Sequence, residues 1–371
     1  MTNIFEWNPT LDQTYDADFT NNTLTTENTN NGLFPVNGFY KKDSDFTLVV
    51  DDNTNVTLAV DPNIPEIPNH INWSSEVYGK AINVVKGTLT CLGTPQESNV
   101  TGTANLLLNG LSNNCLSLNV DGSLYFISYN NNVLEGVNAH VRNSGILKFI
   151  NSEYISIRGS EDIYDINAAA FIDDDASFVA EAKTSVFVHN YHFIASSNSD
   201  RSLFIKSLNG SIEFTNYDSE GTRGIKLLKN AKAHIQSANF KLNHAKVYAH
   251  RDSYLTIKTD NLVVNDGGRF TLTDKGVISL EGTSKKAFTF TGSIAASYPQ
   301  KLFSFSTSPG LVDGYYKFYG LDSGAGLNLL LSYGLLSVDG VTTEQYLRDV
   351  LYFQDLMDGS NKYLKIGMKN L

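Results

Sequence analysis

Residues 231–292 read AKAHIQSANFKLNHAKVYAHRDSYLTIKTDNLVVNDGGRFTLTDKGVISLEGTSKKAFTFTG, and this stretch decides the fold. Pairs of apolar residues, two positions apart, recur along it every seven or eight residues. The pairs are Ala233/Ile235, Phe240/Leu242, Val247/Ala249, Leu255/Ile257, Leu262/Val264, Phe270/Leu272 and Ile278/Leu280. A spacing of two returns side chains to one face of a β-strand, because successive residues of a strand point to opposite faces.

Three of these intervals add up to about 22 residues, the length of one coil in a three-sided parallel β-solenoid. Polar and small residues that suit tight bends fill the gaps between the pairs. The same rhythm continues upstream, for example at Leu147/Phe149 and Ile155/Ile157, and longer bends interrupt it in residues 190–230. Insertions at bends leave the stacked faces of a solenoid untouched. The sequence therefore predicts an all-β protein whose body is a parallel β-solenoid, or β-helix.

The N-terminal region is polar and predicts a different structure. Residues 1–40 are rich in Asn, Thr and Asp, which cannot build a core alone, so we expect an irregular extended segment docked onto this chain or another. Phe46–Val50 and Val56–Val60 alternate like two strands joined by a hairpin turn. Prolines at 62, 65 and 68 then indicate a linker.

The C-terminal region predicts a small β-rich cap with one helix. Thr342 and Gln345 match a T-x-x-Q capping box, and an apolar stripe after them predicts a helix over Thr343–Met357 that ends at Asp358-Gly359. A cap shields the last coil of a solenoid. We therefore divide the chain into an N-terminal attachment segment with a short β-region over 1–68, a β-solenoid over 69–292 and a C-terminal cap or tip over 293–371.

Composition excludes several classes of function. The net charge is −11, and no cluster of Lys and Arg supplies the surface that nucleic acid or an anionic membrane needs. The sequence contains no run of about 18 apolar residues, so we expect no transmembrane helix. Residues 1–9 lack the features of a Sec signal peptide. Neither a phosphate-binding glycine loop nor a G-x-S-x-G elbow occurs, so we expect no cofactor.

Cysteine and histidine give little support to a metal site. Cys91 and Cys115 lie 24 positions apart in apolar-alternating stretches, which favours two buried free thiols; a disulfide between adjacent coils is the alternative. His189/His192 and His244/His250 have close spacings, but neither pair comes with a third ligand at a recognisable spacing. The sequence therefore predicts no metal site.

Two sets of residues are candidates for a functional site. Glycoside cleavage needs a general acid and a second carboxylate, and the acidic clusters offer Asp162, Asp165, Asp173 and Glu181. Acidic residues are also common at exposed bends, so the sequence favours a protein that is not an enzyme. Separately, the run Tyr315–Tyr319 offers three tyrosines that could stack on sugar rings, as an alternative to a place in the core or in a subunit contact. They are Tyr315, Tyr316 and Tyr319.

The overall plan of polar N-terminal segment, β-solenoid and aromatic cap resembles the tail fibres and tailspikes of bacteriophages and of related contractile injection particles. The resemblance implies a homotrimer in a virion tail or extracellular particle, attached through its N-terminal segment to other virion or baseplate proteins. It also implies a host surface polysaccharide as partner. We therefore expect a structural fibre protein that binds a host glycan. A polysaccharide depolymerase and a bacterial surface adhesin of solenoid type are the alternatives.

Overall fold

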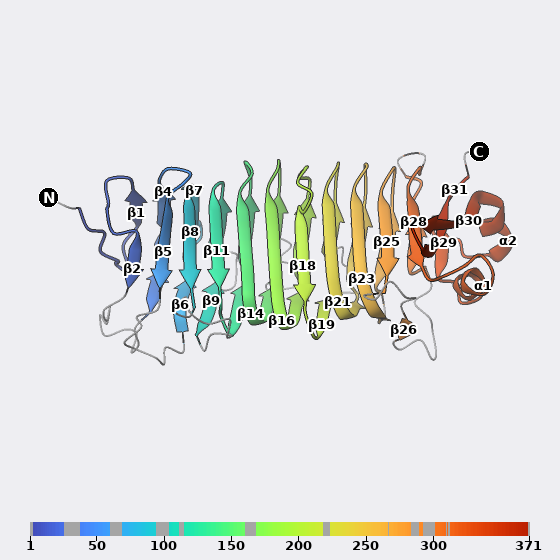
Figure 1. Cartoon of the computed structure of the whole chain (residues 1–371), viewed down its shortest axis with the longest axis horizontal. Coiled ribbons are helices and arrows are strands. Elements are labelled where there is room, and N and C mark those ends of the chain that lie inside the picture. The colour runs from blue at the N-terminus through green and yellow to red at the C-terminus, as the bar shows by residue number, and fades with distance from the viewer. Residues whose placement is uncertain are drawn as a thin grey trace. The chain divides into compact units, whose positions relative to one another are not determined.

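The computed structural model describes residues 3–25, 38–59, 69–93, 104–110, 115–159, 168–217, 223–265, 267–282, 289–291, 301–308, 310 and 312–369. The chain forms two compact units, Met1–Tyr191 and His192–Leu371. Stacked parallel strands dominate each unit, as Figure 1 shows, and the predicted all-β parallel solenoid is confirmed. No helix in the described ranges is long and apolar enough to cross a membrane.

The first unit stacks its strands in three columns. One column runs β1-β4-β7-β10-β13-β15, a second runs β2-β5-β8-β11, and a third runs β3-β6-β9-β12; the long strand β14 pairs with both β11 and β12 and is followed by β16. The strands are β1 (Gln13–Asp16), β2 (Thr23–Thr25), β3 (Phe39–Lys42), β4 (Phe46–Val49), β5 (Asn55–Ala59), β6 (Asn69–Ser74), β7 (Lys80–Lys86), β8 (Thr88–Leu92), β9 (Asn105–Asn109), β10 (Leu116–Val120), β11 (Ser123–Ile127), β12 (Asn131–Glu135), β13 (Val137–Val141), β14 (Ile146–Arg158), β15 (Ala169–Ile172) and β16 (Ser177–His189).

The second unit repeats this plan and adds a cap. One column runs β17-β20-β22-β24-β27-β29, while the long strands β21 and β23 each contribute to both of the other columns. The elements are β17 (His192–Ala195), β18 (Leu203–Ser207), β19 (Ser211–Thr215), β20 (Gly224–Leu227), β21 (Lys232–Asn243), β22 (Lys246–Ala249), β23 (Tyr254–Val264), β24 (Arg269–Leu272), β25 (Val277–Glu281), β26 (Thr289–Thr291), β27 (Phe303–Phe305), β28 (Tyr315–Tyr319), α1 (Ala325–Ser332), β29 (Leu336–Val338), α2 (Glu344–Val350), β30 (Leu351–Asp358) and β31 (Asn361–Met368).

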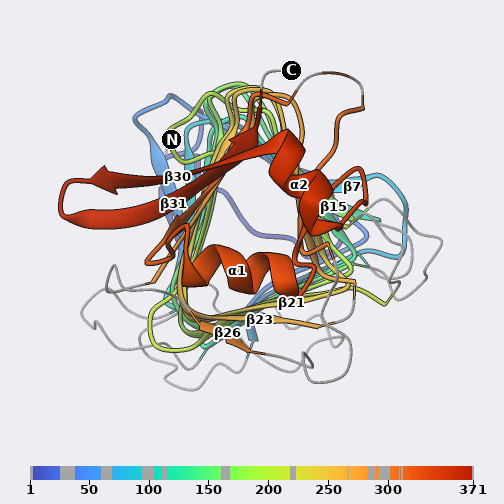
Figure 2. The ribbon, with the colours of Figure 1, turned by 90° about the vertical axis from the view of Figure 1, so that its right-hand side faces the viewer.

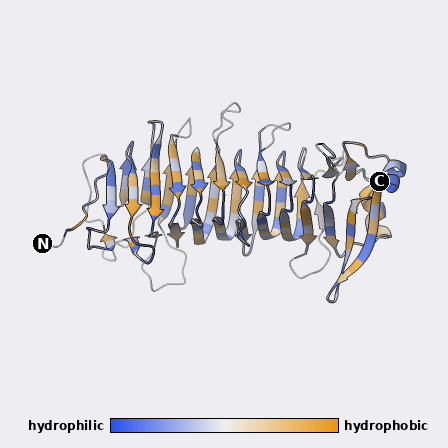
Figure 3. Cartoon of the chain, turned by 90° about the horizontal axis from the view of Figure 1, so that it is seen from above, coloured by the Kyte–Doolittle hydropathy of each residue, from blue (hydrophilic) through white to orange (hydrophobic). Residues whose placement is uncertain are grey.

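The apolar pairs read from residues 231–292 form the core of the second unit. Every member of those seven pairs is at most 1% exposed. Parallel register places each pair over the equivalent pair of the next coil, so that Leu255 lies opposite both Ala233 and Ile278. The coil length is also confirmed, because Asn239 and Asn261, 22 positions apart, join their side-chain amides at 3.2 Å. Figure 3 shows the resulting alternation of hydrophobic and hydrophilic bands along the strands.

The strands of the N-terminal region stack in parallel on the strands that follow them. The predicted hairpin is wrong: β4 pairs in parallel with β1 and β7, whereas β5 pairs in parallel with β2 and β8 in the other sheet. The bend closed by Thr54 N–H and Asp51 C=O at 2.8 Å turns the chain onto the next face instead of back on itself. The preceding segment docks onto its own unit, where Trp7 stacks on Trp73 at 5.8 Å. The three-part division of the chain stays a prediction.

The cap differs from its prediction in detail. The predicted helix is too long: α2 ends at Val350, and residues 351–358 form β30, which pairs antiparallel with β31. The capping box does not form, because the N-cap is Thr343 and it makes no side-chain cap hydrogen bond. Asp358-Gly359 begins the turn of a hairpin, since Asp358 lies opposite Asn361. The apolar run after residue 324 forms a second helix, α1. Figure 2 shows both helices beside the projecting hairpin.

The two cysteines are buried thiols. Cys91 and Cys115 are both free, so the alternative of a disulfide between coils is wrong. Burial raises the pKa of the Cys91 thiol well above its ordinary value, which keeps it protonated and unreactive at neutral pH.

Candidate functional site

The carboxylates singled out in the sequence do not form a recognisable pair in the described residues. Asp162 and Asp165 lie outside the ranges that the structure describes. Asp173 begins a tight turn, in which its C=O accepts the N–H of Ala176 at 3.1 Å, while Glu181 lies on β16. No group of three or more His, Cys, Asp or Glu that could hold a metal ion occurs among the residues that the structure describes.

The tyrosines of β28 divide between the interior and the surface. Tyr316 is fully buried, and its hydroxyl donates to the C=O of Ser304 at 2.8 Å, so its proposal as a ligand-binding residue is wrong. Strand alternation explains this position, because Tyr316 continues the inward column that contains Ile278. Tyr315 and Tyr319 point to the opposite face, where Tyr315 is partly exposed and Tyr319 is buried at 6% exposure.

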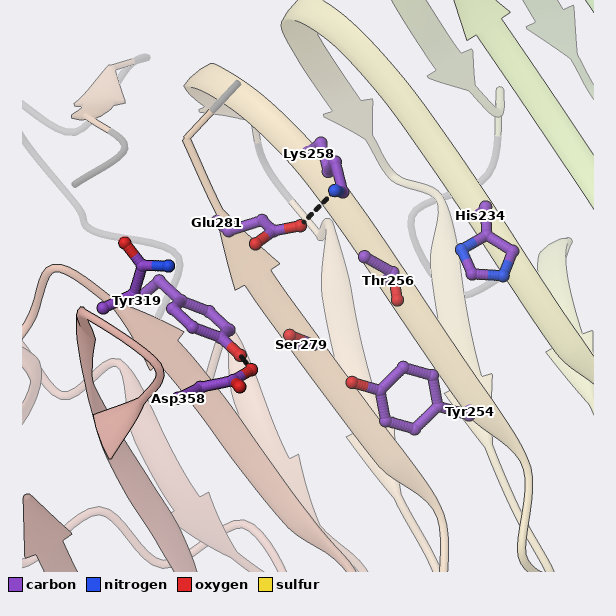
Figure 4. Close-up of a pocket in the computed structure, with 9 residues that line it drawn as sticks. His234, Tyr254, Thr256, Lys258, Ser279, Glu281, Tyr319 and Asp358 are labelled. Carbon is purple, nitrogen blue, oxygen red and sulfur yellow. Dashed lines mark hydrogen bonds and ion pairs between the residues drawn. The ribbon is translucent and has the colours of Figure 1, made fainter. Parts of the chain in front are cut away.

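The outer face of the second unit carries a groove of about 350 Å³. Its walls come from strands β21, β23, β25 and β28 and from the hairpin of the cap, and Figure 4 shows how the side chains lie. The lining residues are His234 from β21, Tyr254, Thr256 and Lys258 from β23, Ser279 and Glu281 from β25, Tyr319 from β28, and Asp358 and Asn361 at the hairpin turn.

Strand alternation and parallel register position the floor of this groove. Leu255 and Ile257 point inward, so the residues before, between and after them point outward. Register then aligns these outward residues across strands: Thr256 lies opposite Ser279, and Lys258 opposite Glu281. Short hydroxyl side chains in the middle of the floor leave the space that the groove occupies.

An ion pair closes one side of the floor. Lys258 Nζ lies 2.9 Å from Glu281 Oε1, and the Glu281 side chain is only 11% exposed. A partly covered pair in adjacent register holds both side chains in one geometry better than a fully exposed pair does. The groove therefore presents one fixed cation and one fixed anion side by side.

The hairpin supplies the second carboxylate. The Tyr319 hydroxyl donates a hydrogen bond to Asp358 Oδ2 at 2.6 Å. Burial raises the pKa of Tyr319, and the Asp358 carboxylate raises it further, so the hydroxyl stays protonated as a donor at neutral pH. Residues 39 positions apart thus meet at the rim of the groove.

His234 supplies a neutral imidazole to the groove. Burial lowers the pKa of His234, a hydrogen bond to the backbone of Asp200 partly opposes this effect, and the positive charges of Arg201 and Lys258 lower the pKa further. The uncharged ring can both donate and accept a hydrogen bond at neutral pH. Together the groove offers aromatic rings, hydroxyls, an amide, an imidazole and two carboxylates on rigid strands.

Sequence reasoning identified only Tyr319 among these lining residues. The available signal was the polar residue between the members of each apolar pair, such as Thr256 between Leu255 and Ile257. Comparison with known proteins adds no relative: no family model matches the chain, and no curated protein or solved structure is significantly similar to it.

Proposed function

We propose that this protein binds a cell-surface glycan in the groove of its second unit, as a fibre protein of the kind that phage tail fibres and tailspikes represent. The observation that carries the proposal is the composition of the groove. Tyr254, which is partly exposed, offers aromatic surface for the apolar face of a sugar ring, and the buried Tyr319 presents its hydroxyl to the groove. Thr256, Ser279 and Asn361 offer hydroxyl and amide groups for sugar hydroxyls.

The rigidity of the groove also supports binding. Its floor consists of strands whose backbones pair on both sides, so few side chains need to be ordered when a ligand arrives. A preorganised site loses less conformational entropy on binding than a site on loops. A saccharide would therefore bind without rearrangement of the solenoid.

The test measures binding of purified protein to an array of bacterial surface polysaccharides. Tyr254→Ala removes a ring from the groove, and we expect its affinity for the bound glycan to fall about tenfold. Tyr248→Ala is the matched control, because Tyr248 lies on β22 outside the groove. Absence of any glycan bound by the unaltered protein, or equal affinities of both variants and the unaltered protein, would contradict the proposal.

Cleavage of the glycan is a second candidate function, because Glu281 and Asp358 line the same groove. Glycoside hydrolysis uses two carboxyl groups, one of which must donate a proton. Glu281 is engaged by the ammonium of Lys258 and Asp358 by the hydroxyl of Tyr319, which favours binding over cleavage. Release of reducing ends that is lost in both Glu281→Gln and Asp358→Asn would establish the depolymerase instead.

The fibre role includes assembly. In this proposal the chain of 40.9 kDa forms a homotrimer in a virion tail or extracellular particle, and its N-terminal region contacts other particle proteins. Light scattering on the purified protein tests the trimer, since a monomeric mass would contradict it. A bacterial surface adhesin with the same glycan-binding groove remains the alternative, and the genes adjacent to this one would distinguish the two.

A further inference from the structure

The terminal strands of the second unit carry tyrosines and lysines on one face. Antiparallel register places Lys317 of β28 opposite Lys365 of β31, and Gly367 opposite both Tyr315 and Tyr352. Residues directly opposite one another in a sheet project from the same face. We call this surface the tyrosine–lysine stripe, and it comprises Tyr315, Lys317, Tyr352, Tyr363 and Lys365.

Each lysine of the stripe is held between two aromatic rings. Lys365 Nζ lies 4.1 Å from the ring centroid of Tyr315 and 5.5 Å from that of Tyr352. Lys317 Nζ lies 5.1 Å from the ring centroid of Tyr363 and 6.0 Å from that of Tyr315. These are cation–π distances, which fix the ammonium groups without neutralising their charge.

Gly367 brings the rings close to the sheet. A Cβ atom at this position would lie 2.4 Å from the Tyr352 hydroxyl oxygen, so only glycine leaves room for the ring over β31. Burial raises the pKa of Tyr352, with a further contribution from Asp313, and the ring therefore stays neutral. The stripe is thus a packed surface of rings with two fixed positive charges.

In the described part of the chain, the two charges lack acidic partners. Among the residues that the structure describes, no carboxylate forms an ion pair with Lys317 or Lys365, although the chain has a net charge of −11. Like charges directly opposite each other destabilise a sheet. An anion bound across both ammonium groups would relieve this repulsion.

The stripe also continues into the groove. The rings of Tyr319 and Tyr363 lie 5.2 Å apart, and Tyr319 lines the groove while Tyr363 belongs to the stripe. A chain of sugar rings could therefore contact both surfaces in sequence. The carboxylates of Glu281 and Asp358 can accept hydrogen bonds from the hydroxyls of such a chain, and Lys258 beside Glu281 supplies a cation.

We propose that the tyrosine–lysine stripe binds the carboxylate groups of an acidic polysaccharide, one rich in uronic acids, whose neighbouring residues occupy the groove. This inference rests on the proposed glycan-binding function and specifies the class of glycan. The partly exposed rings of Tyr315 and Tyr352 take the apolar faces of the sugars, and Lys317 and Lys365 take the uronate carboxylates.

The test compares oligogalacturonate with its methyl ester, which keeps the sugar chain and removes the charge. We expect the unaltered protein to bind the acid at least about tenfold more tightly than the ester, and this preference to weaken as salt rises. The double variant Lys317→Gln/Lys365→Gln should bind both probes equally. Lys362→Gln is the matched control, because Lys362 pairs with Asp355 on β30, away from the stripe, and should keep the preference.

Three results would overturn this proposal: no binding of either probe, no preference for the acid, or a preference that survives in the double variant. Polyglutamate or single-stranded DNA that competes as well as oligogalacturonate would overturn it too, by showing that charge alone is recognised. Tyr254→Ala separates the two proposals. If Tyr254→Ala binds both probes normally while the double variant loses its preference, the groove fails as a glycan site and the stripe stands.

Discussion

The two faces of β28 differ in burial, although tyrosine occurs on both of them. Tyr316 and Phe318 point inward and are fully buried. Tyr315 and Lys317, which alternate with them, are partly exposed on the outer face. Tyr316 packs against Phe303 and Phe305 at 5.4 and 5.2 Å. One strand therefore stabilises the core through alternate residues and leaves the residues between them at the surface.

The largest expected difference between the faces is in stability. Tyr316→Ala removes a buried ring and leaves the C=O groups of Phe270 and Ser304 without its hydroxyl, so we expect a loss of about 3–5 kcal/mol in the free energy of unfolding. Tyr315→Ala, one residue away on the outer face, should cost less than about 1 kcal/mol. Urea unfolding followed by circular dichroism measures both. Equal losses would contradict the division between faces.

The side chain of His192 is intermediate between these two cases, because it is half-buried but points away from the core. Its Nε2 is buried and has no hydrogen-bond partner among the residues that the structure describes. Burial, with smaller effects from Lys226 and Arg223, lowers the pKa of His192 to about 4. In the unfolded chain the imidazole of His192 takes up a proton below about pH 6.5, whereas in the folded chain it does so only below about pH 4. The free energy of unfolding therefore falls as the pH drops from about 6.5 to about 4. We expect a loss of about 2 kcal/mol from this residue by about pH 4.5.

The measurement compares urea unfolding of the unaltered protein and His192→Gln at pH 7 and near pH 4.5. Several carboxylates, including Asp200 and Asp355, also have a lowered pKa, so both proteins lose stability in acid. The variant should lose less, because glutamine does not titrate. Identical pH dependence in the two proteins would show that the imidazole takes up its proton freely in the folded state.

Gly276 tests how closely the coils approach at a corner. A Cβ atom there would lie 2.2 Å from the backbone oxygen of Ala249 in the preceding coil, and strand pairing prevents the two coils from separating. We expect Gly276→Ala to cost about 1–3 kcal/mol. Gly310→Ala is the control, since nothing lies within 4 Å of its added Cβ and the change should leave the melting temperature nearly unchanged. A melting temperature equal to that of the control would contradict the corner contact.

The smallest expected effect concerns the stability of the outer face. Lys317→Gln/Lys365→Gln removes cation–π contacts but also relieves repulsion between two opposed cations, so we expect the free energy of unfolding to change by less than about 1 kcal/mol. Thermal melts measure this directly. A large loss of stability would mean that the lysines hold the cap together, and the binding test would then need single variants.

Much of the fold follows from the chain because burial depends on local alternation. The pair Leu255/Ile257 predicts a strand with one buried face. The recurrence of such pairs after about 22 residues predicts that the strands of successive coils stack. Errors arose where one local pattern fits two structures. Residues 351–358 carry apolar positions compatible with a helical stripe, but pairing with β31 makes them a strand, and the bend at Asp51 fits either a hairpin or the corner of a coil.

The candidate site was less predictable. The sequence by itself determined which residues point inward, because alternation within a strand is a property of the local backbone. Only the tertiary structure decided which outward residues meet, because register between coils and the fold-back of the hairpin join distant positions. Lys258 meets Glu281 one coil later, and Tyr319 meets Asp358 only because β31 returns against β28.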